Sequence, residues 1–346
     1  MKKWLKTCFS ILVAGYFTCS VCNTECIAVS GEETVEGKAE CVMELSSRRI
    51  LYESRGDLRL PMASTTKILT AVTVLEHCED IHQKITIPGV AVGIEGSSVY
   101  LKEDDVYSIE ELLYGLMLRS GNDCAVTLAL ACSGSIAEFS AKMNSVAKKA
   151  GALESRFSNP HGLPSAKHYT TARDLSYITC YAMENPTFCK IVATKYYEPR
   201  HWTNKNKMLS NYEGGIGVKT GYTKEAGRCL VSAATRGNMT IVCSVLNCPM
   251  TYERSAVLLD DAFKAYRYTP LLLKNTALEV QVDGKMIKGI SNKDYYYPLL
   301  EGEKEQVEII TKPIFKQKIG ISEEIIGQFE IYLAKRLLFS GNLYKL

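Results

Sequence analysis

Three short motifs occur in one order along this chain and carry the residue types that acyl transfer requires. They are Ser64-Thr65-Thr66-Lys67, Ser120-Gly121-Asn122 and Lys219-Thr220-Gly221. A serine hydroxyl becomes an effective nucleophile when a base lies within hydrogen-bonding distance, and a lysine amine can be that base. The combination predicts one active site that carries out acyl transfer through a serine ester.

Short motifs also arise by chance, and this chain contains two such repeats. Ser145-Val146-Ala147-Lys148 repeats the first pattern, and Ser340-Gly341-Asn342 repeats the second. Neither fits the order, because Ser145 follows the second motif and Ser340 lies near the last residue. Lys-Thr-Gly occurs only once. The prediction therefore rests on the ordered trio and not on any single motif.

Lys67 is the predicted base. Residues three apart share one face of a helix, which brings its amine beside the Ser64 hydroxyl. Burial and a second cation, Lys219, would lower the pKa of Lys67 and favour its neutral form. Ser120 can relay a proton between the lysines and a leaving amine. We expect Ser64, Lys67 and Ser120 to be the catalytic residues.

The other motif residues are expected to bind substrate. Lys219 and Thr220 offer a cation and a hydroxyl, which suit a free carboxylate. Gly221 allows a substrate to approach the strand closely. Asn122 can bond the substrate backbone or hold Lys67, and the sequence leaves both roles open. Two backbone N–H groups, from Ser64 and from a residue just after Gly221, are the expected oxyanion hole.

These residues need helices and strands to position them. Ser108 and Glu111 form a capping box that opens a helix reaching Leu118, so the second motif should lie in a tight connection between two helices. Pro61 precedes another helix that starts at Ser64. Strand hairpins are expected near 40–53 and 229–246, with Lys219 at or beside a strand. Further helical patterns cover 123–131, 136–150, 171–185 and 254–266.

The two ends of the chain differ in character from its middle. Residues 1–30 combine lysines, an apolar run and small residues near a plausible cleavage site, which predicts a signal peptide and export; an uncleaved anchor is the alternative. Beyond Pro270 short alternating runs predict strands, including 335–339. We therefore expect an α/β (α+β) catalytic domain over 31–268, followed by a small all-β domain over 269–346.

Composition excludes several other functions. The formal charge of +3 includes three leader lysines, so nothing favours nucleic-acid binding. No metal or cofactor is expected, since no H-E-x-x-H or G-x-G-x-x-G pattern occurs and no C-x-x-C pattern occurs beyond the leader. Four of the thirteen cysteines lie in the leader, and most of the other nine occur in apolar runs typical of buried thiols.

Over residues 38–340 the chain resembles the serine-type D-alanyl-D-alanine carboxypeptidases of peptidase family S11, which are low-molecular-mass penicillin-binding proteins. Besides the trio, Asn159-Pro160-His161-Gly162-Leu163 and Tyr222-Thr223 carry the likeness. The resemblance implies a penicillin-recognising transpeptidase/β-lactamase-like catalytic domain, removal of the terminal D-alanine from peptidoglycan stem pentapeptides, and acylation of Ser64 by β-lactams. Arg254 is a tentative match to a substrate-holding arginine of the family.

Alternative functions remain open on the sequence alone. A DD-endopeptidase that cuts wall cross-links would use the same residues, and a β-lactam or wall-peptide sensor would need fewer of them. A class A β-lactamase needs a carboxylate that activates water, and the nearest candidate, Glu138, has the wrong spacing and lies in a predicted helix. Many members of the resembled family carry an amphipathic C-terminal anchor, whereas 335–339 favours a strand. Peripheral membrane association therefore has no clear anchor.

Overall fold

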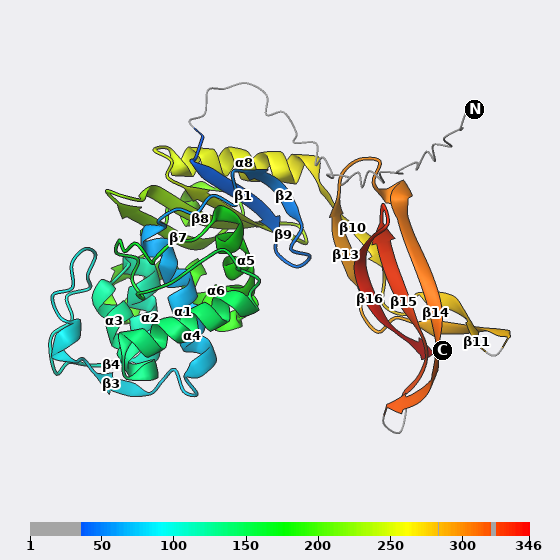
Figure 1. Ribbon diagram of the computed structural model, residues 1–346, viewed down its shortest axis with the longest axis horizontal. Coiled ribbons are helices and arrows are strands. Elements are labelled where there is room, and N and C mark those ends of the chain that lie inside the picture. The colour runs from blue at the N-terminus through cyan, green and yellow to red at the C-terminus, as the bar shows by residue number, and fades with distance from the viewer. Residues whose placement is uncertain (1–35, 283, 320–322) are drawn as a thin grey trace, which may run out of the picture.

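The computed structural model describes residues 36–282, 284–319 and 323–346, so the predicted signal peptide lies outside the described residues. Figure 1 shows a mixed helical and sheet body that contains the three motifs, joined to a second body built of strands. The first body is organised around a five-stranded antiparallel sheet with the strand order β2-β1-β9-β8-β7. Its strands are β1 (Ala39–Glu44), β2 (Ile50–Ser54), β7 (Gly215–Thr223), β8 (Gly227–Arg236) and β9 (Met239–Leu246).

Both faces of this sheet are covered, which explains why its central strands read as nearly continuous apolar runs. Helix α8 (Thr251–Ala265) packs on one face against β8 and β9, and α5 (Ala172–Ala182) packs on the other against β1 and β9. Each interface has its own buried apolar cluster. The sheet therefore holds β7, with the Lys219 motif, at an edge that the helical layer can reach.

The helical layer surrounds α1 (Lys67–His77), which contacts α3, α4 and α5. Among the described residues no single helix is long and apolar enough to cross a membrane; α3 and α4 pass that test only as a pair bent by 88°. The other elements of this body are α2 (Ile109–Tyr114), α3 (Asn122–Ser133), α4 (Ile136–Lys149), α6 (Pro186–Ala193), α7 (Met208–Asn211), β3 (Lys84–Thr86), β4 (Val106–Ser108), β5 (Tyr196–Tyr197) and β6 (Trp202–Thr203).

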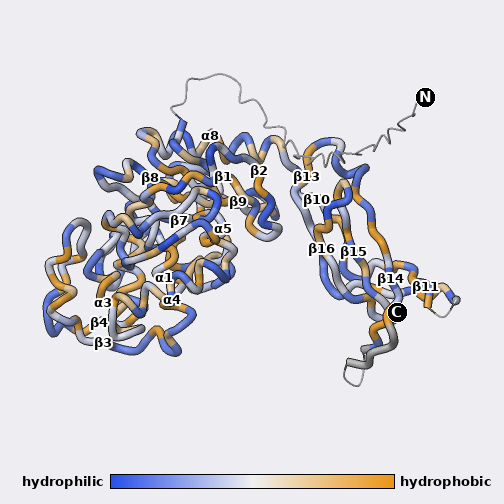
Figure 2. The backbone as a smooth tube through the Cα atoms, in the orientation of Figure 1, coloured by the Kyte–Doolittle hydropathy of each residue, from blue (hydrophilic) through white to orange (hydrophobic). Residues whose placement is uncertain are grey.

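The second body is all-β, as the sequence predicts. Its main sheet has the order β11-β12-β16-β15-β14, beside the pair β10-β13. Hydropathy changes from residue to residue along these strands, as expected where one face is buried (Figure 2). The bounds are β10 (Arg267–Leu272), β11 (Ala277–Val282), β12 (Lys285–Ile290), β13 (Tyr295–Leu299), β14 (Val307–Ile319), β15 (Glu323–Leu333) and β16 (Arg336–Lys345).

Arg49 joins the two bodies. It lies in the β1–β2 connection and its Nη1 donates to the carbonyl of Pro298 at 2.7 Å. Both terminal nitrogens also bond the carboxylate of Glu303, at 2.8 and 2.6 Å. The guanidinium packs over the rings of Tyr266 and Tyr297. Because β10 starts directly after α8, we propose that the two domains divide near residue 268.

Most of the cysteines beyond the leader are buried, as expected. All nine are free thiols, and Cys41, Cys124, Cys180, Cys229, Cys243 and Cys248 lie in the interior. Burial raises the pKa of the Cys229 thiol to about 12, so it stays protonated and unreactive. These cysteines behave as small hydrophobic residues of the core.

Arg254 lies in α8, behind the sheet, where it forms a buried ion pair instead of a contact in the motif cluster. Its Nε and Nη2 donate to the two carboxylate oxygens of Glu40 at 2.8 and 2.7 Å. Both side chains are almost fully enclosed. The tentative role of Arg254 as a substrate-holding residue therefore has no support from its position, and the pair reads as structural.

Replacing Glu40 with glutamine should lower the free energy of unfolding by about 3 kcal/mol, because a buried guanidinium loses its compensating charge. Urea unfolding followed by circular dichroism measures this. The control is Glu184→Gln, which removes an exposed partner of Arg48 and should change stability by less than about 1 kcal/mol. A Glu40→Gln protein of normal stability would contradict the structural role of this ion pair.

Candidate active site

The predicted nucleophile lies in a constrained turn. Ser64 belongs to the 3₁₀ helix Ala63–Thr66, which runs directly into α1. Ala63 has a left-handed backbone, with φ +50. Its carbonyl lies so close to Gly162 that a Cβ there would come within 2.0 Å of the oxygen. The turn can form only because residue 162 is a glycine, which also has a positive φ.

Lys67 is wholly buried, and its amine faces the Ser64 hydroxyl. Lys67 Nζ lies 2.9 Å from Ser64 Oγ, 2.6 Å from Asn122 Oδ1 and 2.7 Å from the carbonyl oxygen of His161. These three partners fix the direction of the amine. Burial lowers the pKa of Lys67 well below its ordinary value, and the charge of Lys219 lowers it further. A neutral amine at this distance can accept the serine proton.

The second motif lies between two helices, as expected, and the structure settles the geometry of Asn122. The capping box at Ser108 starts α2, and a π-helical turn, Gly115–Arg119, leads to Ser120 in a left-handed conformation. Asn122 begins α3; its Oδ1 accepts from Lys67, and its Nδ2 donates to the carbonyl of Glu95. Of the two contacts that the sequence leaves open for Asn122, the structure shows the one to Lys67.

Asp123 anchors the loop that covers this motif. Its buried carboxylate accepts from the Ser98 hydroxyl at 2.5 Å and from the backbone N–H groups of Val99 and Leu101. A Cβ on Gly96 would lie 2.9 Å from Asn122 Nδ2. The loop therefore approaches the amide closely, and the sequence contained no pattern that identified Asp123 as its anchor.

The third motif lies on β7, which brings Lys219 and Gly221 to the region of Ser64. Lys219 is buried, and its Nζ donates to the carbonyl of Thr220 at 2.9 Å. A Cβ on Gly221 would lie 3.1 Å from the backbone nitrogens of Ser64 and Thr65, so the strand runs against the nucleophile turn. Among the described residues, neither lysine hydrogen-bonds to Ser120.

Lys205 adds a cation near the two motif lysines, and sequence reasoning missed it. Burial lowers the pKa of Lys219 to about 7, and the charge of Lys205 contributes. The same charge helps to lower the pKa of Lys67. Lys205 lies in the segment before α7, where no spacing rule links it to the motifs. Lys219 and Lys205 together make the site suitable for an anionic substrate.

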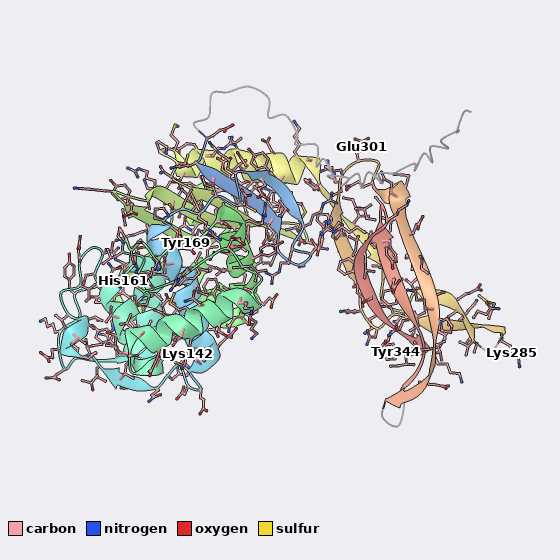
Figure 3. The ribbon with its side chains drawn as sticks, in the orientation of Figure 1. Lys142, His161, Tyr169, Lys285, Glu301 and Tyr344 are labelled. Carbon is pink, nitrogen blue, oxygen red and sulfur yellow. The ribbon has the colours of Figure 1, made fainter. Side chains whose placement is uncertain are left out.

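The segment Asn159–Leu163 supplies backbone groups to the site. Its Asn159 side chain accepts from the N–H of Gly162 at 2.7 Å, which closes a tight turn. The turn directs the carbonyls of Pro160 and His161 toward α1, where Thr70 and Lys67 donate to them. Figure 3 places His161 within the helical part of the first body, far from Lys285 and Tyr344 of the second. His161 is thus a turn residue, as expected, whose carbonyl contacts the amine.

Asn122→Asp should slow acylation of the protein by penicillin about 100-fold at neutral pH. The new carboxylate, beside Lys67 Nζ, would stabilise the protonated amine and so remove the general base. Raising the pH should recover part of the rate. Stopped-flow measurement with a fluorescent penicillin tests this, with Asn238→Asp on the exposed β8–β9 turn as the control. An unchanged rate would show that Asn122 does not influence the protonation of Lys67.

Comparisons with known proteins agree with this arrangement. A family model described as D-alanyl-D-alanine carboxypeptidase, peptidase S11, matches residues 27–250. The D-alanyl-D-alanine carboxypeptidase DacF of Bacillus subtilis is 32% identical over 262 residues, which cover 71% of this chain and 67% of that protein.

Solved structures match in the same regions. The crystal structure of the Streptomyces K15 DD-transpeptidase has a TM-score of 0.64 at 33% identity, and the match covers 68% of this chain and 100% of that one. Penicillin-binding protein 5 of Haemophilus influenzae has a TM-score of 0.74 at 24% identity over 92% of this chain and 98% of that one. The second match extends the similarity of fold to the β-rich part.

Proposed function

Because this chain belongs to the S11 family of D-alanyl-D-alanine carboxypeptidases, we propose that it removes the terminal D-alanine from peptidoglycan stem pentapeptides through an ester on Ser64. One observation carries the proposal: a wholly buried amine, Lys67 Nζ, lies 2.9 Å from Ser64 Oγ. Burial lowers the pKa of that amine and so favours the neutral form that acts as a base, and the distance suits direct proton transfer.

Acylation begins when neutral Lys67 accepts the Ser64 proton. Ser64 Oγ then attacks the carbonyl carbon of the penultimate D-alanine, and the negative charge develops on the carbonyl oxygen. Backbone N–H groups of Ser64 and of Tyr222, which follows Gly221, are the proposed donors to that oxygen. Collapse of the intermediate breaks the peptide bond, and the departing D-alanine amine takes the proton from Lys67, with Ser120 as the relay.

Deacylation repeats these steps with water. Lys67 accepts a proton from water, the hydroxide adds to the ester carbonyl, and Ser64 leaves with the proton restored. A β-lactamase needs a carboxylate that activates water, and the candidate nearest in spacing in this sequence is Glu138. Glu138 is exposed in the first turn of α4, where its backbone N–H bonds the Ser135 cap. This supports a penicillin-sensitive enzyme over a β-lactamase.

Substrate binding would use the free edge of β7. An extended peptide can pair with an edge strand through backbone hydrogen bonds. Lys219, Thr220 and the nearby Lys205 would bind the terminal carboxylate, and Gly221 gives the peptide room beside the strand. A β-lactam offers the same carboxylate and a strained amide, so it is the expected acylating inhibitor. The chemistry needs no metal or cofactor.

Peptide mapping after reaction with benzylpenicillin tests the assignment of the nucleophile. We expect a single penicilloyl adduct on the peptide that contains Ser64. An adduct on any other serine, or none after prolonged incubation, would contradict the proposed acyl-enzyme.

A second outcome for the same acyl-enzyme is transfer to an amine instead of water. The observation that favours it is the 33% identity with a protein solved as a DD-transpeptidase. Incubating the protein and the substrate peptide with increasing concentrations of an acceptor amine, such as D-methionine, distinguishes the two reactions. A rising yield of exchanged peptide would show transfer, whereas release of free D-alanine alone would show hydrolysis. Cross-linked wall dimers as substrates would reveal endopeptidase activity.

We also propose that the protein acts outside the cytoplasmic membrane, in wall synthesis and the control of cell shape. The leader pattern in residues 1–30 supports export, and the proposed substrate lies in the wall. Nothing in the net charge favours nucleic acid as a partner. The proposed partner is the peptidoglycan stem peptide, with peripheral membrane association left to experiment.

A further inference from the structure

A buried histidine connects the two segments that position the reacting groups. His168 is only 3% exposed. Its Nδ1 accepts from the backbone N–H of Ser158 at 3.1 Å, and its Nε2 lies 2.8 Å from Thr66 Oγ1. A backbone N–H can only donate, so Nδ1 must be unprotonated and the ring proton must lie on Nε2. The imidazole therefore donates to the Thr66 hydroxyl.

The Thr66 hydroxyl passes this hydrogen bond on to the nucleophile turn. Having accepted from His168, Thr66 Oγ1 donates to the carbonyl of Ala63 at 2.8 Å. Ala63 is the residue with a left-handed backbone immediately before Ser64. A non-glycine residue adopts that conformation only when its surroundings hold it there. The hydrogen bond to its carbonyl is one such restraint on the direction of Ser64.

The other arm of His168 reaches the segment that holds the base. Ser158 leads into Asn159–Leu163, whose Pro160 carbonyl accepts from Thr70 at 2.6 Å. The next carbonyl, that of His161, accepts from Lys67 at 2.7 Å. One imidazole is thus hydrogen-bonded to both segments, at the turn with Ser64 and at the loop that orients Lys67.

We propose that His168 is a positioning residue for acylation, which through Thr66 and Ser158 keeps Ser64 Oγ and Lys67 Nζ at reacting distance. This inference rests on the proposed roles of Ser64 and Lys67. It requires a neutral ring, since a doubly protonated imidazole could not accept from Ser158. Burial, together with the charges of His161 and Lys67, lowers the pKa of His168 to about 3, so the ring is neutral at physiological pH.

Variants at the two ends of the Thr66–His168 hydrogen bond test the proposal. Thr66→Val removes the hydroxyl at nearly constant volume. His168→Asn keeps an acceptor for Ser158, but its shorter side chain places no donor at the Nε2 position beside Thr66. Stopped-flow acylation with a fluorescent penicillin gives the noncovalent affinity and the acylation rate constant separately. We expect each variant to lower the rate constant about 30-fold, with affinity changed less than about 2-fold, because misplaced reacting groups lose orientation and not binding.

A rescue variant and a double variant distinguish a positioning role of His168 from an effect on the stability of the fold. Thr66→Ser should restore the rate to within about 3-fold of the unaltered protein, and the double variant Thr66→Val/His168→Asn should be no slower than either single one. Thr73→Val is the matched control: it makes the same change on α1 at a buried hydroxyl that has no hydrogen-bond partner among the described residues, and it should leave the rate unchanged.

The thermal unfolding of every variant is measured together with its acylation rate constant. Equal rate constants in folded Thr66→Val and Thr66→Ser proteins would overturn the inference, as would a loss in Thr73→Val as large as that in Thr66→Val. If His168→Asn does not fold, the Thr66 pair carries the comparison alone. If the unaltered protein is not acylated at Ser64, the proposed function itself fails, which is a different result from unaffected variants.

Discussion

Replacing Ser64 with alanine should abolish the acyl-enzyme and lower the rate of D-alanine release at least about 10⁴-fold. The turn that presents Ser64 is built from backbone bonds and from the hydroxyls of Thr65 and Thr66, so the substitution removes the nucleophile and leaves its supports in place. Intact-mass measurement after incubation with benzylpenicillin should show the adduct on the unaltered protein and none on the variant.

The chain provides a matched control for this experiment. Ser145 belongs to the repeated S-x-x-K pattern, which the structure places on the exposed face of α4. Ser145→Ala should react with penicillin at the normal rate. A penicilloyl adduct that persists on Ser64→Ala would move the nucleophile elsewhere and contradict the active site described above.

Lys67→Arg should lower the acylation rate about 10³-fold, although arginine carries the same positive charge as a protonated lysine. A guanidinium cannot lose its proton in a protein, so arginine can stabilise negative charge but cannot act as the base. The comparison separates the two possible roles of Lys67, and stopped-flow acylation measures it. Lys148→Arg, at the exposed lysine of the repeated pattern, is the control.

The pH dependence of acylation should follow from the same roles. Because the active form of Lys67 is neutral, the rate should fall as the pH drops through the pKa of Lys67, which burial and Lys219 lower. The Lys67→Arg protein should lack that acidic limb. An arginine variant that reacts at a near-normal rate with an unchanged pH profile would show that another group accepts the serine proton.

The sequence predicts the elements and the central contact of the site because both depend on local spacing. The capping box at Ser108, the placement of Lys219 at a strand and the pairing of Ser64 with Lys67 all follow from patterns a few residues long. The fold class is confirmed as an α/β catalytic body with a β-rich body after it. The motif spacing indicates acyl transfer in general, and the resemblance to the family adds the expected substrate.

The remaining contacts join residues that no local pattern connects. Thr66 and His168 are 102 positions apart, and Lys205 influences Lys219 from a segment without a motif. Arg254 shows that a correct helix prediction does not fix a side chain's role. The sequence predicts its helix near the observed residues, but the side chain pairs with Glu40, 214 positions away. Tertiary packing determines these contacts, so the burial of a charge or a ring cannot be predicted from local sequence patterns.

The most direct test of the account is the release of D-alanine from diacyl-Lys-D-Ala-D-Ala by the purified protein. The account predicts stoichiometric release of one D-alanine per peptide, blocked by prior incubation with penicillin and lost in Ser64→Ala. Penicillin acylation of Ser64 without any D-alanine release, from this peptide or from a cross-linked dimer, would contradict it and leave a β-lactam-binding sensor as the function of this site.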